Sequence, residues 1–398
     1  MNDRMDRRQA PPVPTRENPQ IIGLDAVRFL AAAIVMFYHL RFWRNGDLPP
    51  VEHQLSRALW VGWVGVPIFF VLSGIVIAFS ARNSTPTGFA QSRFLRLAPG
   101  VWICATLSLV IGLGFMHPAD PLLLARFWQT VVLLPVGNHI DVVYWTLTVE
   151  VAFYALIFLV LRVRGFSAVV PVMVAVGLLS AAYEGTRILQ DLGQASVLPG
   201  FWLAAVTAIS KKTVARLLLL PHGIYFSLGV LIGALQRDRR RLLLWVWACF
   251  FTAVCFLNVR HEAGRYLVRN AMTGVASWGP ALVWLAATAA MVGSLAANRW
   301  LSGRSAGLNA TLRFLGLLTF PVYLLHNTNG LLLEGFLMEQ GCGRIAAFWI
   351  TVGMIFALAA AVTALLEPWL RRRLKDFIGR GLARSQIAPV SPVIRAEA

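Results

Sequence analysis

The residues best suited to chemistry lie in the first apolar segment, which reads IIGLDAVRFLAAAIVMFYHLRFW from Ile21. An ionisable side chain inside a membrane-length helix costs about 2.5–3.5 kcal/mol on insertion scales, so Asp25, Arg28 and His39 each mark a candidate site. Asp25 and Arg28 have the spacing of a helical ion pair. Arg28 and His39 share one face of a straight helix, at ~16.5 Å separation along its axis. An imidazole suits proton transfer and a guanidinium binds anions, so one long anionic molecule lying along this helix would contact both.

The second apolar segment contains GVPIFFVLSG, in which Phe69 and Phe70 precede Ser73 and Gly74. Phe69 and Ser73 share one helical face, and Gly74 lets a neighbouring backbone or a ligand approach closely. Close packing of small residues between helices is the simpler interpretation of this motif by itself. The third segment is preceded by Arg93 and Arg96, which predict either a topology signal or a cationic cradle for phosphates.

Two further ionisable residues fall inside later apolar segments. Glu150 lies in VVYWTLTVEVAFYALIFLV, where a buried carboxylate must be paired or protonated. His326 lies in LGLLTFPVYLLHNTNG, where it serves either helix–helix hydrogen bonding or function, since Asn327 and Asn329 make the surroundings polar. By depth, the inner half of the membrane is expected to hold Arg28, Ser73, Gly74, Arg93 and Arg96, and the outer half His39, Glu150 and His326.

The segments that carry these residues are helices of membrane-spanning length. Of the 398 residues, 58% are apolar and only 14% are charged, against about 25% charged in soluble domains. The composition therefore excludes soluble, disordered and coiled-coil chains and predicts an all-α, polytopic membrane protein. Two short apolar stretches, 121–135 and 197–209, are expected to be re-entrant or interfacial. The ten predicted spans are 21–42, 61–81, 98–116, 143–161, 166–183, 217–235, 242–258, 275–297, 312–331 and 345–367.

The distribution of basic residues gives the orientation. With ten spans, one side carries 23 Lys and Arg residues and the other 12, which places both termini in the cytoplasm. The predicted organisation is a polar tail over 1–20, a membrane domain over 21–370 and a basic tail over 371–398. The net charge of +18 is explained by these flanks, and neither a nucleic-acid-binding groove nor a metal site is expected. The four cysteines are interpreted as packing residues without a disulfide framework.

Six motifs, in order, resemble those of the acyltransferase-3 family of integral-membrane O-acyltransferases. LDAVR begins the Arg-x10-His pattern of Arg28 and His39, and GVPIFFVLSG is similar to the family's FFxxSG segment. RFLR followed by LAPGVW resembles its RxxR motif, and YWTLTVEVAFY resembles its WSLxVExxFY motif. FPVYLLH and LLEPW complete the series near the end of the chain. Thr146 and Thr148 stand where the family usually has Ser, and Phe320-Pro321 replaces a Ser-Tyr pair.

The resemblance implies a stand-alone carbohydrate O-acetyltransferase-like enzyme, without the appended esterase-like domain of some members. Its expected donor is acetyl-CoA or another acyl-CoA, used as a co-substrate with no permanently bound cofactor. Its expected acceptor is a sugar hydroxyl of a lipid-linked or cell-surface carbohydrate, at a bacterial inner membrane. The expected catalytic residues are His39, Arg28 and Glu150, the donor-binding residues are Arg93, Arg96, Ser73, Gly74, Phe69 and Phe70, and the acceptor-side residues are His326 and Trp145.

Several alternatives remain open from the sequence. His39 is expected to act as general base or as a covalent acyl carrier, with Glu150 orienting its imidazole. A transporter or flippase for a glycan or small anion would use Arg28, Glu150 and His326 as a substrate or proton pathway. Against that rival, the sequence shows neither an inverted repeat nor a pair of broken helices.

Overall fold

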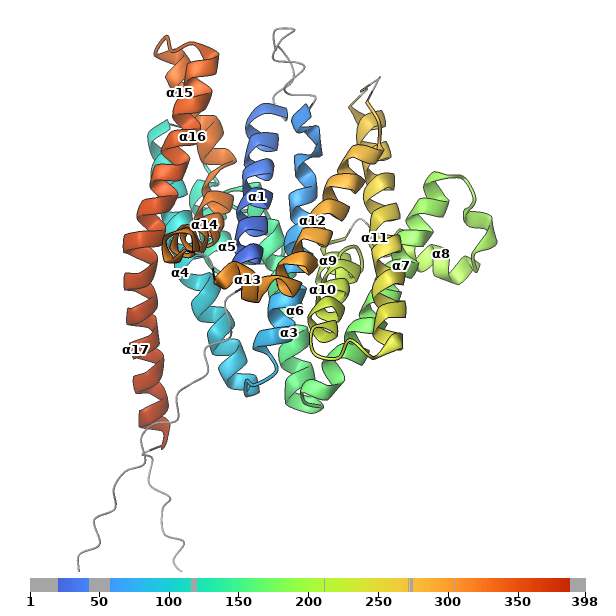
Figure 1. Ribbon diagram of the computed structural model, residues 1–398. Helices are drawn as coiled ribbons and strands as arrows, with labels where there is room; N and C mark the ends of the chain where they lie inside the picture. The colour runs from blue at the N-terminus through green and yellow to red at the C-terminus, as the bar shows by residue number, and fades with distance from the viewer. Residues whose placement is uncertain are drawn as a thin grey trace, which may run out of the picture.

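The computed structural model describes residues 21–42, 58–115, 120–210, 212–270, 272, 275–303 and 305–386. The predicted N-terminal tail, His53, His117 and the last twelve residues lie outside this part of the chain. The described residues are helical with short connections, as the composition predicts. The helices of the central bundle run side by side, with α8 at its edge and α17 extending beyond the other helices (Figure 1).

Nine helical segments among the described residues are long and apolar enough to cross a membrane. The first is α1 (Ile22–Phe37) with a following π turn, and the second is α3 (Gly65–Ser80) with the short helix before it. The chain therefore forms a multi-pass membrane bundle. The other seven segments are built on α4 (Pro86–Phe115), α6 (Trp145–Val163), α7 (Val169–Asp191), α11 (Leu242–Arg269), α12 (Trp278–Ala296), α14 (Ala306–Leu325) and α16 (Arg344–Ala361).

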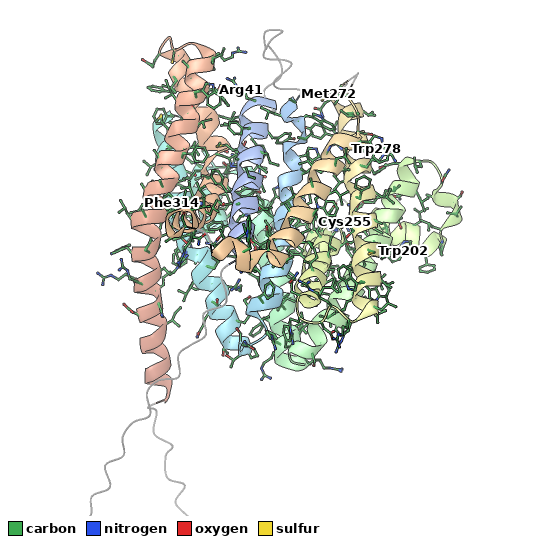
Figure 2. All side chains as sticks on the ribbon, viewed as in Figure 1. Arg41, Trp202, Cys255, Met272, Trp278 and Phe314 are labelled. Carbon is green, nitrogen blue, oxygen red and sulfur yellow. The ribbon has the colours of Figure 1, made fainter. Side chains whose placement is uncertain are left out.

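The shorter helices connect or fill the bundle. The two apolar stretches set apart as too short to span form α5 (Leu123–Val131) and α8 (Gly200–Ser210), of 9 and 11 residues. The remaining short helices are α9 (Thr213–Leu217), α10 (Gly223–Leu235), α13 (Asn298–Ser302) and α15 (Thr328–Glu339). We call the end of the bundle at which α1 begins the inner end. The opposite end carries Arg41, Met272 and Trp278, labelled in Figure 2.

The predicted span 217–235 differs most from the structure. The chain turns between α9 and α10, with Leu219 at a φ of 58° and Pro221 unable to donate a backbone hydrogen bond. Only the 13 residues of α10 remain, about 20 Å of helix, which is shorter than the hydrocarbon core. Nearly all of α10 is buried, and it packs against α3, α7 and α11. It is thus the central helix of the bundle, and it leaves His222 on the turn at its start.

Two predicted spans end too early. α7 continues to Asp191 and α11 to Arg269, each well past the predicted ends at 183 and 258. The added turns carry charged side chains, which a hydropathy pattern excludes from a span. The structure stabilises these charges by pairing α7 with α11 at the outer end of the bundle.

The end of α1 is not the straight helix assumed from spacing. A π turn over Tyr38–Phe42 includes His39 and changes the direction in which its imidazole points. Arg41 on this turn forms an ion pair with Glu334 at 3.6 Å, and its guanidinium lies 3.9 Å from the ring centre of Phe348. These contacts with α15 and α16 hold the π turn in place.

The last helices form one continuous rod. α16 passes through a second π turn (Val362–Leu366) into α17 (Glu367–Gln386). Pro368 lacks a backbone N–H, which accounts for the altered hydrogen bonding before it. The first part of the predicted basic tail is therefore helical, and it continues the last span.

Close packing of α3 on α10 depends on two facing glycines. A Cβ added at Gly74 would collide with the Phe226 carbonyl, and one at Gly229 would collide with the Val71 carbonyl. The two helix backbones therefore touch, as in other small-residue helix pairs. Gly74 was expected to bind the donor, but it faces α10 and is not among the residues that line the neighbouring cavity.

Replacing Gly229 with alanine should destabilise the fold, because α3 and α10 must move apart to admit a methyl group. We expect a loss of about 1–3 kcal/mol, measured by thermal unfolding in detergent micelles. Gly293→Ala in α12 is the matched control, since a Cβ there meets nothing within 4 Å. Equal melting temperatures for the two variants would contradict this assignment.

Candidate active site

A cavity near the inner end contains three guanidinium groups. Arg28 of α1 and Arg93 and Arg96 of α4 line it together, although α1 and α4 are far apart in sequence. Its volume is about 130 Å³, below the roughly 300–1,000 Å³ of pockets that bury a whole drug-sized ligand. The cavity can therefore hold one arm of a large anionic molecule, with the remainder outside. The expected donor residues Ser73, Phe69 and Phe70 also line it.

The expected pairing of Arg28 is present. Its Nη1 atom lies 3.0 Å from Asp25 Oδ1, one turn earlier on α1. Gly316 of α14 makes room for the Asp25 side chain, since a Cβ there would approach the carboxylate within 2.7 Å. This ion pair offsets part of the cost of placing Arg28 in the bundle.

Glu150 lies in the arginine-lined cavity, and its expected role as the orienting partner of His39 is wrong. Its Oε1 atom accepts hydrogen bonds from Ser73 Oγ at 2.9 Å and from Tyr154 OH at 2.5 Å. Among the described residues it forms no hydrogen bond with His39. Glu150 lies in the outer half of the segment Val142–Val163, and its side chain faces the same cavity as the inner arginines. Tyr154, four residues later, is a site residue that the sequence analysis missed.

Arg96 of the RFLR motif is held in place by the start of α17. Arg96 Nη1 lies 3.8 Å from Glu367, and Glu367 also accepts a hydrogen bond from Arg371. Arg371 Nε donates to the Leu95 carbonyl at 3.2 Å. That carbonyl is available because Pro99, four residues on, has no N–H to donate to it. The LAPG and LLEPW segments thus form one contact that positions Arg96.

His39, on the π turn after α1, contacts His326, at the end of α14. His39 Nδ1 lies 2.9 Å from His326 Nε2, and the His326 side chain is completely buried. His326 is not among the lining residues of the arginine-lined cavity or of the two larger cavities farther out, and its contact with the acceptor stays a prediction. It contacts His39 and acts as a positioning residue.

The hydrogen bonds assign the tautomers of this pair. His326 Nδ1 lies 2.8 Å from the Tyr323 carbonyl and 3.2 Å from the Val322 carbonyl, so Nδ1 carries the proton. His326 Nε2 is then an acceptor, and His39 Nδ1 must donate to it. The lone pair of the neutral His39 imidazole therefore resides on Nε2, the atom required for a base or a nucleophile.

Asp141 holds the backbone that follows His326. It is 1% exposed, and its Oδ2 accepts from the Thr328 backbone N–H at 2.7 Å. Its Oδ1 accepts from Asn327 Nδ2 at 3.0 Å and from the Val143 N–H at 3.1 Å. Its negative charge also acts on the His39 imidazole. Asp141 thus fixes the segment next to His326, and the sequence signal for it was a helix-capping Asp directly before VVYW.

His39 lines a second cavity of about 510 Å³, which lies on the side away from the arginines. This cavity and the arginine-lined cavity share three wall residues, Val66, Phe70 and Tyr323. Arg28 and His39 therefore open onto two cavities that meet at one wall. Tyr323 is fixed there by a 3.0 Å hydrogen bond between its hydroxyl and Thr146 Oγ1.

A third cavity, of about 890 Å³, continues from the second toward the outer end. Trp145, Arg187, His222 and Glu262 line both of them. Trp145 was expected on the acceptor side, and the guanidinium carbon of Arg216 lies 5.4 Å from its ring centre. His222 falls inside the predicted span 217–235, and the turn before α10 places it in the cavity wall. Burial lowers the pKa of His139 at the outer rim, so this imidazole is neutral at pH 7.

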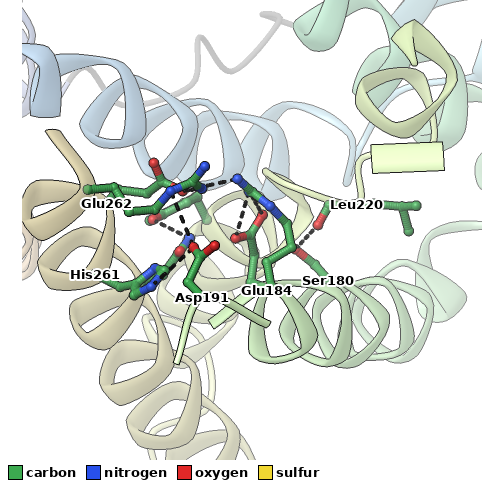
Figure 3. A network of polar contacts seen from close by, with 10 residues as sticks. Ser180, Glu184, Asp191, Leu220, His261 and Glu262 are labelled. Atoms are coloured by element: carbon green, nitrogen blue, oxygen red, sulfur yellow. Dashed lines mark hydrogen bonds and ion pairs between the residues drawn. The ribbon is translucent and has the colours of Figure 1, made fainter. Parts of the chain in front are cut away.

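The polar wall contributed by α7 and α11 was missed because both spans were ended too early. Arg187 Nη1 contacts both Glu184 oxygens at 3.1 and 3.2 Å, and its Nη2 lies 3.3 Å from Glu262 (Figure 3). Arg265 joins Glu262 to Asp191, which also contacts His261. His261 had been assigned to a loop but lies on α11.

The comparisons with known proteins identify the family of this chain. Residues 21–367 match the family model described as an acyltransferase domain. Nodulation protein 10 of Rhizobium leguminosarum bv. viciae is 25% identical over 218 residues, covering 48% of this chain and 59% of that protein. The chain thus spans about three fifths of the length of that relative. No solved structure matches the chain.

The family match covers the first five motifs, the LLE of LLEPW, and every residue that lines the two cavities, from Arg28 to Leu331. The chain belongs to the acyltransferase-3 family and is a multi-pass membrane protein.

Proposed function

We propose that the protein transfers an acyl group, acetyl in the simplest case, from acyl-CoA to a hydroxyl of a lipid-linked or cell-surface carbohydrate. The proposed setting is the bacterial inner membrane, with the inner end of the bundle facing the cytoplasm. The observation that carries this proposal is the position of His39. Its imidazole lies on a cavity that shares a wall with the cavity lined by Arg28, Arg93 and Arg96.

The arginine-lined cavity suits the donor. Acyl-CoA is anionic at its nucleotide end and carries the thioester on a long, narrow arm. Guanidinium groups form strong charge-assisted hydrogen bonds with phosphates. Because the cavity is small, it would hold the thioester arm, with the nucleotide outside it on the cytoplasmic side. Phe69 and Phe70 would flank the arm, and Ser73 and Glu150 would fix the wall beside Arg28.

His39 would act as general base through its Nε2 lone pair. It removes the proton from the acceptor hydroxyl while the hydroxyl oxygen attacks the thioester carbonyl. The C–S bond then breaks, and the leaving CoA thiolate takes the proton from the imidazolium. His326 would hold the imidazole, and the negative charge of Asp141 would stabilise its protonated form. The same lone pair also suits attack on the thioester to form an acyl-imidazole, which is the second course open to this residue.

The direct test uses the purified protein in nanodiscs with [14C]acetyl-CoA and a bacterial cell-envelope glycan preparation. We expect label in glycan that mild alkali releases as acetate. His39→Ala should lower this transfer by about 10²–10⁴-fold, because the general base is lost. Phe377→Ala, at an exposed side chain of α17, is the control. Full transfer by His39→Ala would refute the catalytic role, and the absence of ester-linked label with wild type would favour the transporter.

The donor site is tested by removing its cations. Arg93→Ala combined with Arg96→Ala should raise the KM for acetyl-CoA by about 10–100-fold, because charge-assisted hydrogen bonds to phosphate are lost. The same variant should retain its KM for S-acetylpantetheine, which has no phosphate groups. Arg162→Ala, on the exposed last turn of α6, is the matched control. An equal loss with both donors would contradict phosphate binding.

Asp141→Asn tests the positioning of the histidine pair. One carboxylate oxygen becomes an NH2 group that faces a backbone N–H, so the segment after His326 should shift. We expect kcat to fall by about 10²-fold while the KM for acetyl-CoA stays within twofold. Asp238→Asn, on the turn between α10 and α11, should leave both constants unchanged. A change confined to KM would show that Asp141 acts on donor binding instead.

A further inference from the structure

Two polar atoms in the His39 cavity have no hydrogen-bond partner among the described residues. Asn258 of α11 is 4% exposed, and its Oδ1 atom is unsatisfied, whereas its Nδ2 donates to Tyr225 OH at 3.1 Å. Trp63 Nε1 is unsatisfied as well, and both side chains line the cavity. A buried polar group without a partner is costly, so a pair of them facing one cavity points to a ligand or to water.

The two atoms need hydrogen-bond partners of opposite kinds. Asn258 Oδ1 accepts a hydrogen bond, and Trp63 Nε1 can only donate one. A hydroxyl group does both, so a molecule with several hydroxyls satisfies the two atoms at once. The cavity volume of about 510 Å³ lies within the range of small-molecule pockets.

The charged wall restricts the ligand further. The charged groups that line the cavity are Glu184, Glu262 and Arg187. With Asp191 and Arg265, they form a network in which three carboxylates share two guanidinium groups, and the neighbouring His261 is its remaining titratable member. An excess carboxylate at a buried site opposes a second anion and tolerates a neutral hydroxyl.

We infer that this cavity is the acceptor subsite and holds one uncharged sugar ring, with hydroxyls on Asn258 Oδ1 and Trp63 Nε1. This inference rests on the proposed transfer to a carbohydrate. The ring enters through the outer cavity, past Trp145 and His222, and one hydroxyl reaches His39 Nε2. Asn258 and Trp63 thus determine specificity without taking part in the proton transfer.

Binding without catalysis tests the site separately from the proposed function. The probe is methyl β-glucopyranoside, added without donor to the protein in nanodiscs and followed by saturation-transfer NMR titration. Trp63→Phe and Asn258→Leu should each weaken binding by about 5–100-fold, since each loses one hydrogen bond and leaves a hydroxyl unpaired. Trp245→Phe, whose indole donates to the Arg239 carbonyl near the inner end, is the matched control. Melting temperatures identify any variant that fails to fold.

Charge selectivity gives a second readout. Wild type should bind the glucoside at least tenfold more tightly than methyl β-glucuronide, and Glu184→Gln should reduce that ratio. The site inference is overturned if wild type binds no glucoside, if both cavity variants bind as wild type does, or if the glucuronide binds better. Those results would mean a cavity filled with water only, or one for a different ligand. Glucoside binding that depends on Trp63 and Asn258, without acetyl transfer, would uphold the sugar site and refute the proposed transfer.

Discussion

The hydrogen bond between His39 and His326 joins the π turn after α1 to the end of α14, and much of the site geometry depends on it. Inside a bundle of apolar helices a ring nitrogen needs a hydrogen-bond partner, and the pair provides one for His39 Nδ1 and for His326 Nε2 without bringing in a charge. The Tyr323 carbonyl fixes the proton on His326. That assignment in turn fixes His39 as the donor within the pair. The chemistry proposed for His39 Nε2 thus follows from a carbonyl two residues beyond Pro321.

The same requirement for partners explains the irregular helices around the site. The π turn at His39 is held by Arg41 and its contacts with Glu334 and Phe348. A second π turn precedes Glu367, which meets Arg96 and Arg371. In both places a departure from regular helix carries a charged residue into a contact between helices. Arg96 and Glu367 lie on the RFLR and LLEPW motifs, so these two motifs encode backbone geometry as well as side-chain chemistry.

The cavities at the two ends of the bundle differ in size and in charge. The inner cavity carries three guanidinium groups and a small volume, which favours the narrow arm of an anionic donor. The outer cavities are larger and carry mixed charge, aromatic rings and unsatisfied amide and indole atoms. Between them stands a wall of Val66, Phe70 and Tyr323. The proposed reaction requires the acyl group and the acceptor hydroxyl to meet at that wall, next to His39.

The sequence by itself determined the membrane class, most of the helices, the family and the Asp25–Arg28 pair, because hydropathy, motif order and i,i+3 spacing are local properties of the chain. The sequence also predicted that Arg28, Arg93 and Arg96 lie at a similar depth, in the inner half of the membrane. Only the tertiary structure decided the partners of each polar group. Depth along a helix does not say which way a side chain faces, so Glu150 was assigned to His39 instead of Ser73 and Tyr154. The charged last turns of α7 and α11 have the composition of loops, so hydropathy ended both spans before them. In the structure each helix provides counter-ions for the other, and this pairing places Glu184, Arg187 and Glu262 in the cavity wall.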